Sequence, residues 1–169
     1  MLERTPDSPP VIQHVPNHIK RPLWSVMIPT YNDLPHLEKT IECVLAHNIG
    51  PETMQIVVVD DCSTKGDVRA VVQSIGNGRV EYCRHDQNVG SLRNFEKCLN
   101  LSTGQWVHIL HGDDQVMLGF YEEIEVLFRS YPQAGAAFTN MAHTTVGSDT
   151  LEIHPPLANE AGIPQDFLS

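Results

Sequence analysis

Short apolar runs alternate with longer amphipathic stretches along the 169-residue chain. The run at 55–60 has no polar alternation, which is typical of a strand buried on both faces. Apolar segments at 23–29, 80–83, 106–110 and 135–139 predict four further strands. Between them, apolar residues recur at helical spacing on one face. These stripes are Leu34, Leu37, Ile41, Val44 and Leu45; Val68, Val71, Val72 and Ile75; Leu92, Phe95 and Leu99; and Phe120, Ile124, Leu127 and Phe128. The last two stripes are expected to face inward, toward the core.

Strands that alternate with helices predict an α/β fold, with a doubly wound, mainly parallel sheet and helices on both of its faces. Residues 23–140 carry this pattern. Residues 1–22 contain five prolines and no periodicity, so we expect an extended or disordered leader laid over the domain surface. Residues 141–169 lose the alternation and predict a loop-rich region.

The charge balance excludes some classes of partner. The chain has 21 acidic and 11 basic side chains, a net charge of −10, and no cluster of lysines or arginines. Binding to nucleic acid or to an anionic membrane surface is therefore not expected. The longest apolar run, 56–59, is too short to span a bilayer. The 4 cysteines show no C-x-x-C pattern, which predicts reduced thiols in a cytoplasmic protein.

The apolar run at 106–110 leads into two adjacent carboxylates, Asp113 and Asp114. Two like charges repel each other unless a cation lies beside them, and a divalent cation that holds a polyanionic ligand is one explanation. The alternative is a solvated turn or a helix N-cap, where aspartate is also favoured. Taken alone, the pair does not distinguish these two interpretations.

Neighbouring loops favour the ligand-binding interpretation. Loops 29–33, 60–63 and 111–114 all follow strands and carry polar side chains. Ligands of open α/β sheets bind outside the carboxyl ends of strands, and in the order 3-2-1-4 the first and last of these loops share one crevice. No glycine-rich phosphate motif is present, so a phosphate would depend on a metal. Carboxylates favour Mg²⁺ or Mn²⁺ over zinc, and His108 is predicted on the strand face opposite His111, which argues against their sharing an ion.

Several segments resemble, in order and spacing over about residues 23–140, the motifs of family 2 glycosyltransferases with the GT-A fold. They are Ser25-Val-Met-Ile-Pro-Thr-Tyr-Asn32, Ile56-Val-Val-Val-Asp-Asp-Cys-Ser-Thr64, Asn88-Val-Gly90 with Arg93-Asn94, Gly104-Gln-Trp-Val, and His111-Gly-Asp-Asp114. The resemblance implies an enzyme that transfers a sugar, with inversion, from a nucleoside diphosphate sugar to an unknown acceptor. A UDP-sugar is the expected donor.

The resemblance also implies roles for individual residues. The expected donor-binding residues are Pro29, Thr30, Tyr31, Asn32, Asp61, Gly90, Arg93, Asp113 and Asp114. Asp61 would accept a hydrogen bond from the nucleobase, whereas Asp60 either contributes to binding or caps its loop. Asp113 and Asp114 would ligate Mn²⁺ or Mg²⁺. The family often has an aspartate where this chain has His111, which is either a third ligand or a residue that lines the crevice.

The family places its general base beyond the fifth strand, and nothing in the spacing selects Asp149, Glu152, Glu160 or Asp166. We therefore expect the general base to lie outside this chain. We also expect that any attachment of the protein to the inner face of a membrane would be made by segments outside this chain. A non-catalytic nucleotide-binding fragment is an alternative. A phosphoacceptor receiver module is another, although receivers need a lysine after the fifth strand and none follows Lys97. A nucleotidyltransferase would need a basic, glycine-rich loop after the first strand.

Overall fold

The computed structural model describes residues 5, 8–12, 14–47, 49–144 and 151–153. It divides into two units, Met1–Met117 and Leu118–Ser169. The elements of the first unit are β1 (Trp24–Thr30), α1 (Leu34–Ala46), β2 (Met54–Asp60), α2 (Val68–Gly76), β3 (Glu81–Arg84), α3 (Ser91–Leu101) and β4 (Trp106–Ile109). Those of the second unit are α4 (Phe120–Ser130), β5 (Ala142–Thr144) and β6 (Leu151–Ile153).

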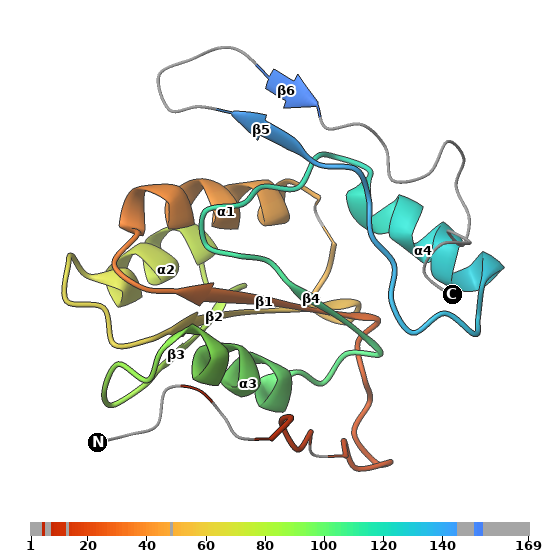
Figure 1. Cartoon of the computed structure of the whole chain (residues 1–169), viewed down its shortest axis with the longest axis horizontal. Coiled ribbons are helices and arrows are strands. Elements are labelled where there is room, and N and C mark those ends of the chain that lie inside the picture. Colours follow the sequence, from red (N-terminus) through yellow and green to blue (C-terminus); the bar gives the residue numbers. More distant parts are fainter. Residues whose placement is uncertain (1–4, 6–7, 13, 48, 145–150, 154–169) are drawn as a thin grey trace. The chain divides into compact units, whose positions relative to one another are not determined.

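The sheet of the first unit has the order β3-β2-β1-β4, and every pairing in it is parallel. Figure 1 shows α1 and α2 on one face of this sheet and α3 on the other. The predicted doubly wound arrangement is therefore confirmed, and the sheet has the order 3-2-1-4 that the sequence analysis considered. Because the strands are parallel, the carboxyl ends of β1, β2 and β4 lie at the same edge of the sheet.

The core is built on the two central strands. Every residue of β1 is buried, and so is every residue of β2 except Gln55. The helix α1 begins with Pro35 in its first turn and buries Leu37, Ile41 and Val44, as the apolar stripe predicted. At the start of α2, the Asp67 carboxylate accepts a hydrogen bond from the backbone N–H of Ala70.

The apolar stripe of α3 was predicted to face inward, and that prediction is wrong. The residues of α3 that are buried are Asn94 and Cys98, whereas Leu92 is 48% exposed. Leu92, Phe95 and Leu99 instead line a hollow of about 440 Å³ together with Ser8, Pro9 and Pro10 of the leader. Within the described part of the leader, Ser8, Pro9 and Pro10 thus lie at the surface of α3. Asn94 can be buried on the side of α3 that faces the sheet because its side-chain amide donates a hydrogen bond to the Val59 carbonyl, at 3.0 Å.

Two strand predictions also need correction. The segment 135–139 contains no strand, and the strand that follows, β5, pairs antiparallel with β6. Its apolar side chains are small except for Phe138, which is 49% exposed, so the segment has little area to bury. The strand β4 is only partly buried, with Val107 40% exposed, and it pairs with β1 alone among the described strands.

All four cysteines are free thiols, as predicted, although Cys98 is the one that is fully buried. None of the helices in the described part of the chain combines the length and the apolar character that crossing a membrane requires.

Candidate functional site

The His111–Asp114 loop follows β4 and is packed against the end of β1. The backbone N–H of Leu110 donates to the Met27 carbonyl at 2.9 Å, and the N–H of Asp114 donates to the His111 carbonyl at 3.0 Å, which closes a turn. Gly112 at the centre of this turn allows a close approach to β1, because a Cβ there would lie 3.1 Å from the Pro29 carbonyl oxygen, a tight contact. The turn therefore brings His111 and both aspartates to the strand edge.

Helix α1 holds the same loop from the other side. The hydroxyl of Thr40 is fully buried and lies 2.9 Å from the carbonyl oxygen of Gly112 and 2.8 Å from that of Asp114. It lies 3.1 Å from the His36 carbonyl as well, so these acceptors share its single proton. One helical turn on, the Cys43 sulfur accepts from the N–H of Val116, at 3.4 Å. The loop is thus fixed by main-chain contacts, which leaves its side chains available.

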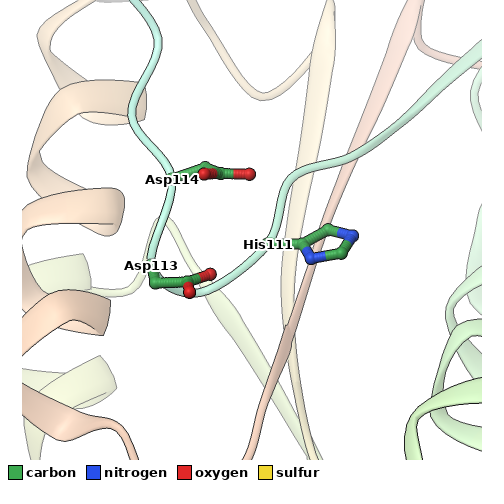
Figure 2. Close-up of side chains that lie close together, drawn as sticks. All are labelled: His111, Asp113 and Asp114. Carbon is green, nitrogen blue, oxygen red and sulfur yellow. The ribbon is translucent and has the colours of Figure 1, made fainter. Parts of the chain in front are cut away.

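His111, Asp113 and Asp114 form a group of possible metal ligands. One ligand atom from each lies within 4.8 Å of those of the other two, and all three side chains are exposed. Figure 2 shows both carboxylates directed toward the side of the loop on which His111 lies. Two carboxylates and an imidazole suit a divalent cation that also binds oxygen, so this donor set fits Mn²⁺ or Mg²⁺.

A hollow of about 290 Å³, here called the strand-end hollow, lies beside this group. Its lining residues come from the ends of β1 and β2, from the start of α3 and from the His111–Asp114 loop. They are Pro29, Thr30, Tyr31, Asp33, Asp61, Asn88, Gly90, Ser91, Asn94, Phe95, His111, Gly112 and Asp113. The strand ends predicted to share one crevice do share it.

Thr30 is a buried residue of this hollow whose side-chain hydroxyl has no hydrogen-bond partner among the described residues. The residue is 5% exposed. Its hydroxyl oxygen would lie 3.4 Å from a Cβ placed on Gly112, so it is next to the His111–Asp114 loop. A buried hydroxyl without a partner is costly, and a bound ligand that hydrogen-bonds to it would remove that cost.

The two aspartates at the end of β2 have different environments. Asp61 faces the strand-end hollow, and its carboxylate accepts from the N–H groups of Val89 (2.7 Å) and Gly90 (2.9 Å) and from the amide of Asn88 (2.8 Å). It therefore shapes the loop that leads into α3. The residue is 3% exposed and lines the hollow, so it serves the loop and the hollow together.

Asp60 is not among the residues that line the hollow and is bound in a polar network. Its carboxylate accepts from the N–H of Ser63 at 2.8 Å, from the Tyr82 hydroxyl at 2.7 Å and from the Arg84 guanidinium at 2.6 Å. Burial alone would raise the pKa of Asp60, but the hydrogen bonds from Ser63, Tyr82 and Arg84 outweigh it and hold that pKa below the usual value. Of the two roles open to Asp60, loop capping is the one that these contacts support.

Comparison with known proteins identifies the family. The family model for glycosyl transferase family 2 matches residues 25–160. The chain belongs to glycosyl transferase family 2. The match covers each of the five motifs from Ser25 to Asp114, so the resemblance noted in the sequence is confirmed at the level of the family.

Relatives in this family are longer than the present chain. An uncharacterized protein of Mycobacterium tuberculosis is 33% identical over 118 residues, 70% of this chain and 36% of that protein. The putative teichuronic acid biosynthesis glycosyltransferase TuaG of Bacillus subtilis is 31% identical over 97 residues, 56% of this chain and 37% of that protein. The chain thus spans about a third of the length of the curated relatives it matches.

Solved structures of the same fold agree. Staphylococcus aureus TarS, residues 1–349, superposes with a TM-score of 0.59 at 21% identity, over 64% of this chain and 33% of TarS. The mannosyltransferase PcManGT of Pyrobaculum calidifontis gives 0.51 at 23% identity, over 64% of this chain and 32% of that protein. At these identities the likeness concerns the fold, and it confirms the GT-A type expected from the family 2 motifs.

Three of the residues expected to bind the donor do not line the hollow of this family 2 domain. The Asn32 side-chain oxygen accepts from the N–H groups of Thr64 (2.8 Å) and Lys65 (2.9 Å), and so ties the loop after β1 to the loop after β2. Arg93 pairs with Glu96 at 2.9 Å, one turn along α3. Asp114 is also absent from the lining, although it belongs to the group of possible metal ligands.

Six further residues that line the hollow were not among those expected to bind the donor: Asp33, Asn88, Ser91, Asn94, Phe95 and Gly112. Phe95 had been assigned to the core, yet its ring lies 5.2 Å from that of His111, centroid to centroid. Asn94 donates to the Val59 carbonyl and lies 3.2 Å from a ring nitrogen of His85. Asn88 and Asn94 fall within a motif that carried the family resemblance, and their place in that motif could have marked them as candidate site residues.

His108 gives the first testable prediction. Burial, and to a smaller extent the charge of His111, lower the pKa of His108 from 6.5 to about 4. The unfolded state therefore takes up a proton first as the pH falls. The contribution to stability is complete above pH 6.5 and is lost as the pH falls toward 4, by about 3 kcal/mol at most.

Urea denaturation of wild type and His108→Gln between pH 7.5 and about pH 4.5 checks this expectation. The free energy of unfolding should fall less steeply with pH in the variant. His18→Gln, which changes an exposed histidine of the leader, serves as control and should follow the wild-type curve. Parallel curves for wild type and His108→Gln would contradict the prediction.

Proposed function

We propose that this chain supplies the donor-binding and metal-binding half of a glycosyltransferase that transfers a sugar, with inversion, from a nucleoside diphosphate sugar to an acceptor. The observation that carries the proposal is the presence of three possible metal ligands, His111, Asp113 and Asp114, beside the strand-end hollow of a family 2 domain. Because the chain spans about a third of its relatives, the complete reaction is attributed to the longer protein.

The nucleoside occupies the part of the hollow formed by the ends of β1 and β2. Tyr31 is 47% exposed there and offers an aromatic face for a base. The unpartnered hydroxyl of Thr30 can bond to the ribose or the diphosphate. Three of the roughly four acceptor positions of the Asp61 carboxylate are filled, which leaves one for a base N–H.

Remaining donor contacts come from the backbone of Pro29 and from Gly90, which both line the hollow. Arg93 contributes to donor binding only if it exchanges Glu96 for the donor. Asn32 acts through the loop that it holds. The volume of the hollow is at the low end for small-ligand sites, so it takes part of a nucleotide sugar and leaves the rest outside.

A divalent cation, when bound, stabilises the negative charge that develops on the diphosphate as the glycosyl bond breaks. Asp113 and Asp114 would hold this cation, and Thr40 keeps their loop in place. The general base that takes the acceptor proton is assigned to the part of the longer protein that this chain does not span. Of the candidate carboxylates, Glu152 is exposed on β6, and Asp149, Glu160 and Asp166 lie outside the described residues.

The donor we propose is a UDP-sugar bound with Mn²⁺ or Mg²⁺. In support, TarS has been solved in complex with UDP-GlcNAc and with UDP, and PcManGT in complex with GDP-Man and Mn²⁺. The alternative is a fragment that binds nucleotide without catalysing transfer. It is favoured by the short span of the chain relative to its relatives and is tested by comparing donor hydrolysis with that of a longer chain.

Isothermal titration of UDP and GDP, each with Mn²⁺, with Mg²⁺ and with a chelator, tests the proposal. We expect wild-type protein to bind UDP in a metal-dependent manner. Asp113→Asn should weaken that binding by at least about tenfold, because a neutral amide replaces a charged ligand of similar shape.

Glu38→Gln, which neutralises an exposed carboxylate on α1, is the matched control and should bind like wild type. Nucleotide binding that is absent, or unchanged when metal is chelated, would overturn the donor site. If Asp113→Asn and Glu38→Gln lost UDP affinity equally, the effect of Asp113 would come from the loss of a negative charge anywhere on the domain, and not from a metal contact.

A further inference from the structure

We infer that His111 is itself a metal ligand and that it makes the site select first-row transition ions, Mn²⁺ among them, over Mg²⁺. The inference rests on the proposed function and assigns its metal preference. It starts from the composition of the ligand group, in which one imidazole nitrogen lies within 4.8 Å of an oxygen from each of Asp113 and Asp114.

The His111 ring is held in place, although it is exposed. Its centroid lies 5.2 Å from that of Phe95, with an angle of 43° between the rings. The main chain on either side is fixed by the turn from His111 to Asp114 and by the hydroxyl of Thr40. A ring restrained at both its face and its backbone loses less freedom when a metal binds, so less affinity is lost to ordering.

A second observation, independent of the ligand group, points to a ligand at this place. Thr30 is only 5% exposed, and it lines the strand-end hollow next to Gly112. Its hydroxyl has no hydrogen-bond partner among the described residues. A group that bonds to this hydroxyl would lie beside the His111–Asp114 loop. The hollow therefore offers a partner for a polar ligand beside the loop that carries the three possible metal ligands.

The imidazole decides the metal preference. Mg²⁺ binds oxygen ligands and keeps its waters, so a nitrogen ligand adds little to its affinity. Affinity of sites with nitrogen ligands rises along the first transition series from Mn²⁺, and imidazole is a good ligand for these ions. Two carboxylates without a nitrogen would discriminate less. His111 therefore separates the affinities for Mn²⁺ and Mg²⁺, while Asp113 and Asp114 serve both ions.

The test measures metal binding directly on the full chain with UDP present. The electron paramagnetic resonance signal of free Mn²⁺ reports the bound fraction, and Mg²⁺ is added as competitor. In His111→Ala the preference for Mn²⁺ over Mg²⁺ should fall by at least about tenfold, because loss of a group that only supports a metal ligand already costs about 10–100-fold in affinity. His111→Asp should strengthen Mg²⁺ binding relative to wild type. His18→Ala is the control and should keep the wild-type preference.

Nitrogen modulation in pulsed spectra of bound Mn²⁺ gives a second readout that does not depend on any variant. It should be present in wild type and absent in His111→Ala. A wild-type spectrum without nitrogen modulation, or the same Mn²⁺ preference in His111→Ala as in wild type, would overturn this inference and leave the donor site standing. If wild type with UDP binds neither ion, both the inference and the proposed function fail.

Discussion

Gly104→Ala should destabilise the domain by about 3 kcal/mol, the upper part of the range for forcing extra atoms into a packed interior. A Cβ at Gly104 would lie 2.5 Å from the backbone nitrogen of Ser25 and 2.6 Å from the carbonyl carbon of Trp24. Both contacts are with main-chain atoms of β1, the most buried strand of the sheet. A rotamer change cannot relieve them.

The same turn is fixed by hydrogen bonds that a shift would break. The hydroxyl of Ser25 accepts from the N–H groups of Gly104 at 2.8 Å and Thr103 at 3.1 Å. The guanidinium of Arg21 donates to the carbonyl oxygens of Thr103 and Gly104. Moving the chain away from β1 to admit a methyl group would therefore cost these bonds as well.

Gly50→Ala is the matched control, because a Cβ at Gly50 meets nothing within 4 Å. Neither glycine has a positive φ, so the two substitutions differ in space alone. Thermal and urea denaturation should show a large loss for Gly104→Ala and a change within about 0.5 kcal/mol for Gly50→Ala. Equal stability of the two variants would show that β1 and the Gly104 turn separate easily.

Elements whose sequence pattern has a single physical cause were predicted well. The uninterrupted run at 55–60 can be buried only between two layers, and β2 is the strand that lies second from one edge, beneath α1 and α2 on one side and α3 on the other (Figure 1). The alternation of strands and helices left the strand order open, and the order found, β3-β2-β1-β4, is the one considered in the sequence analysis. From that order, the meeting of the loops after β1 and β4 could be predicted.

Features that depend on tertiary contacts could not be predicted. In α3, the stripe of Leu92, Phe95 and Leu99 has helical spacing, but spacing does not say whether a sheet or the leader covers it. The same holds for the 135–139 segment, because a short apolar run predicts a strand only if a partner strand is present. Asp60 and Asp61 are adjacent in sequence, yet only the positions of Arg84 and Tyr82 show which carboxylate is bound in a structural network.

The candidate metal site shows the same division. Asp113 and Asp114 could be chosen from the sequence because two adjacent carboxylates at a strand end need a counter-charge. His111 could not be assigned to either of its two possible roles, since the turn that brings it to the aspartates depends on Gly112 and Thr40. The ring contact between His111 and Phe95 joins the loop after β4 to α3, so the spacing of residues around His111 could not predict it.

Asp61→Asn should both destabilise the domain and weaken UDP binding. The carboxylate faces three donors, the N–H groups of Val89 and Gly90 and the amide of Asn88, and no acceptor. Asparagine keeps one oxygen and introduces an NH₂ group, which can only oppose one of these donors. Leaving a buried N–H unsatisfied costs about 1–3 kcal/mol, so we expect a loss of about 2 kcal/mol.

Amide hydrogen exchange locates the effect, because the N–H groups of Val89 and Gly90 should exchange faster in Asp61→Asn while those of β1 change only with global stability. Asp86→Asn, an exposed carboxylate of the same loop, is the matched control and should change stability by less than about 0.5 kcal/mol. Because the 88–90 loop lines the strand-end hollow, UDP affinity should fall in Asp61→Asn and persist in Asp86→Asn. Unchanged protection at Val89 and Gly90 would mean that Asp61 does not hold this loop, and its place in the site would then rest on direct contact with the base alone.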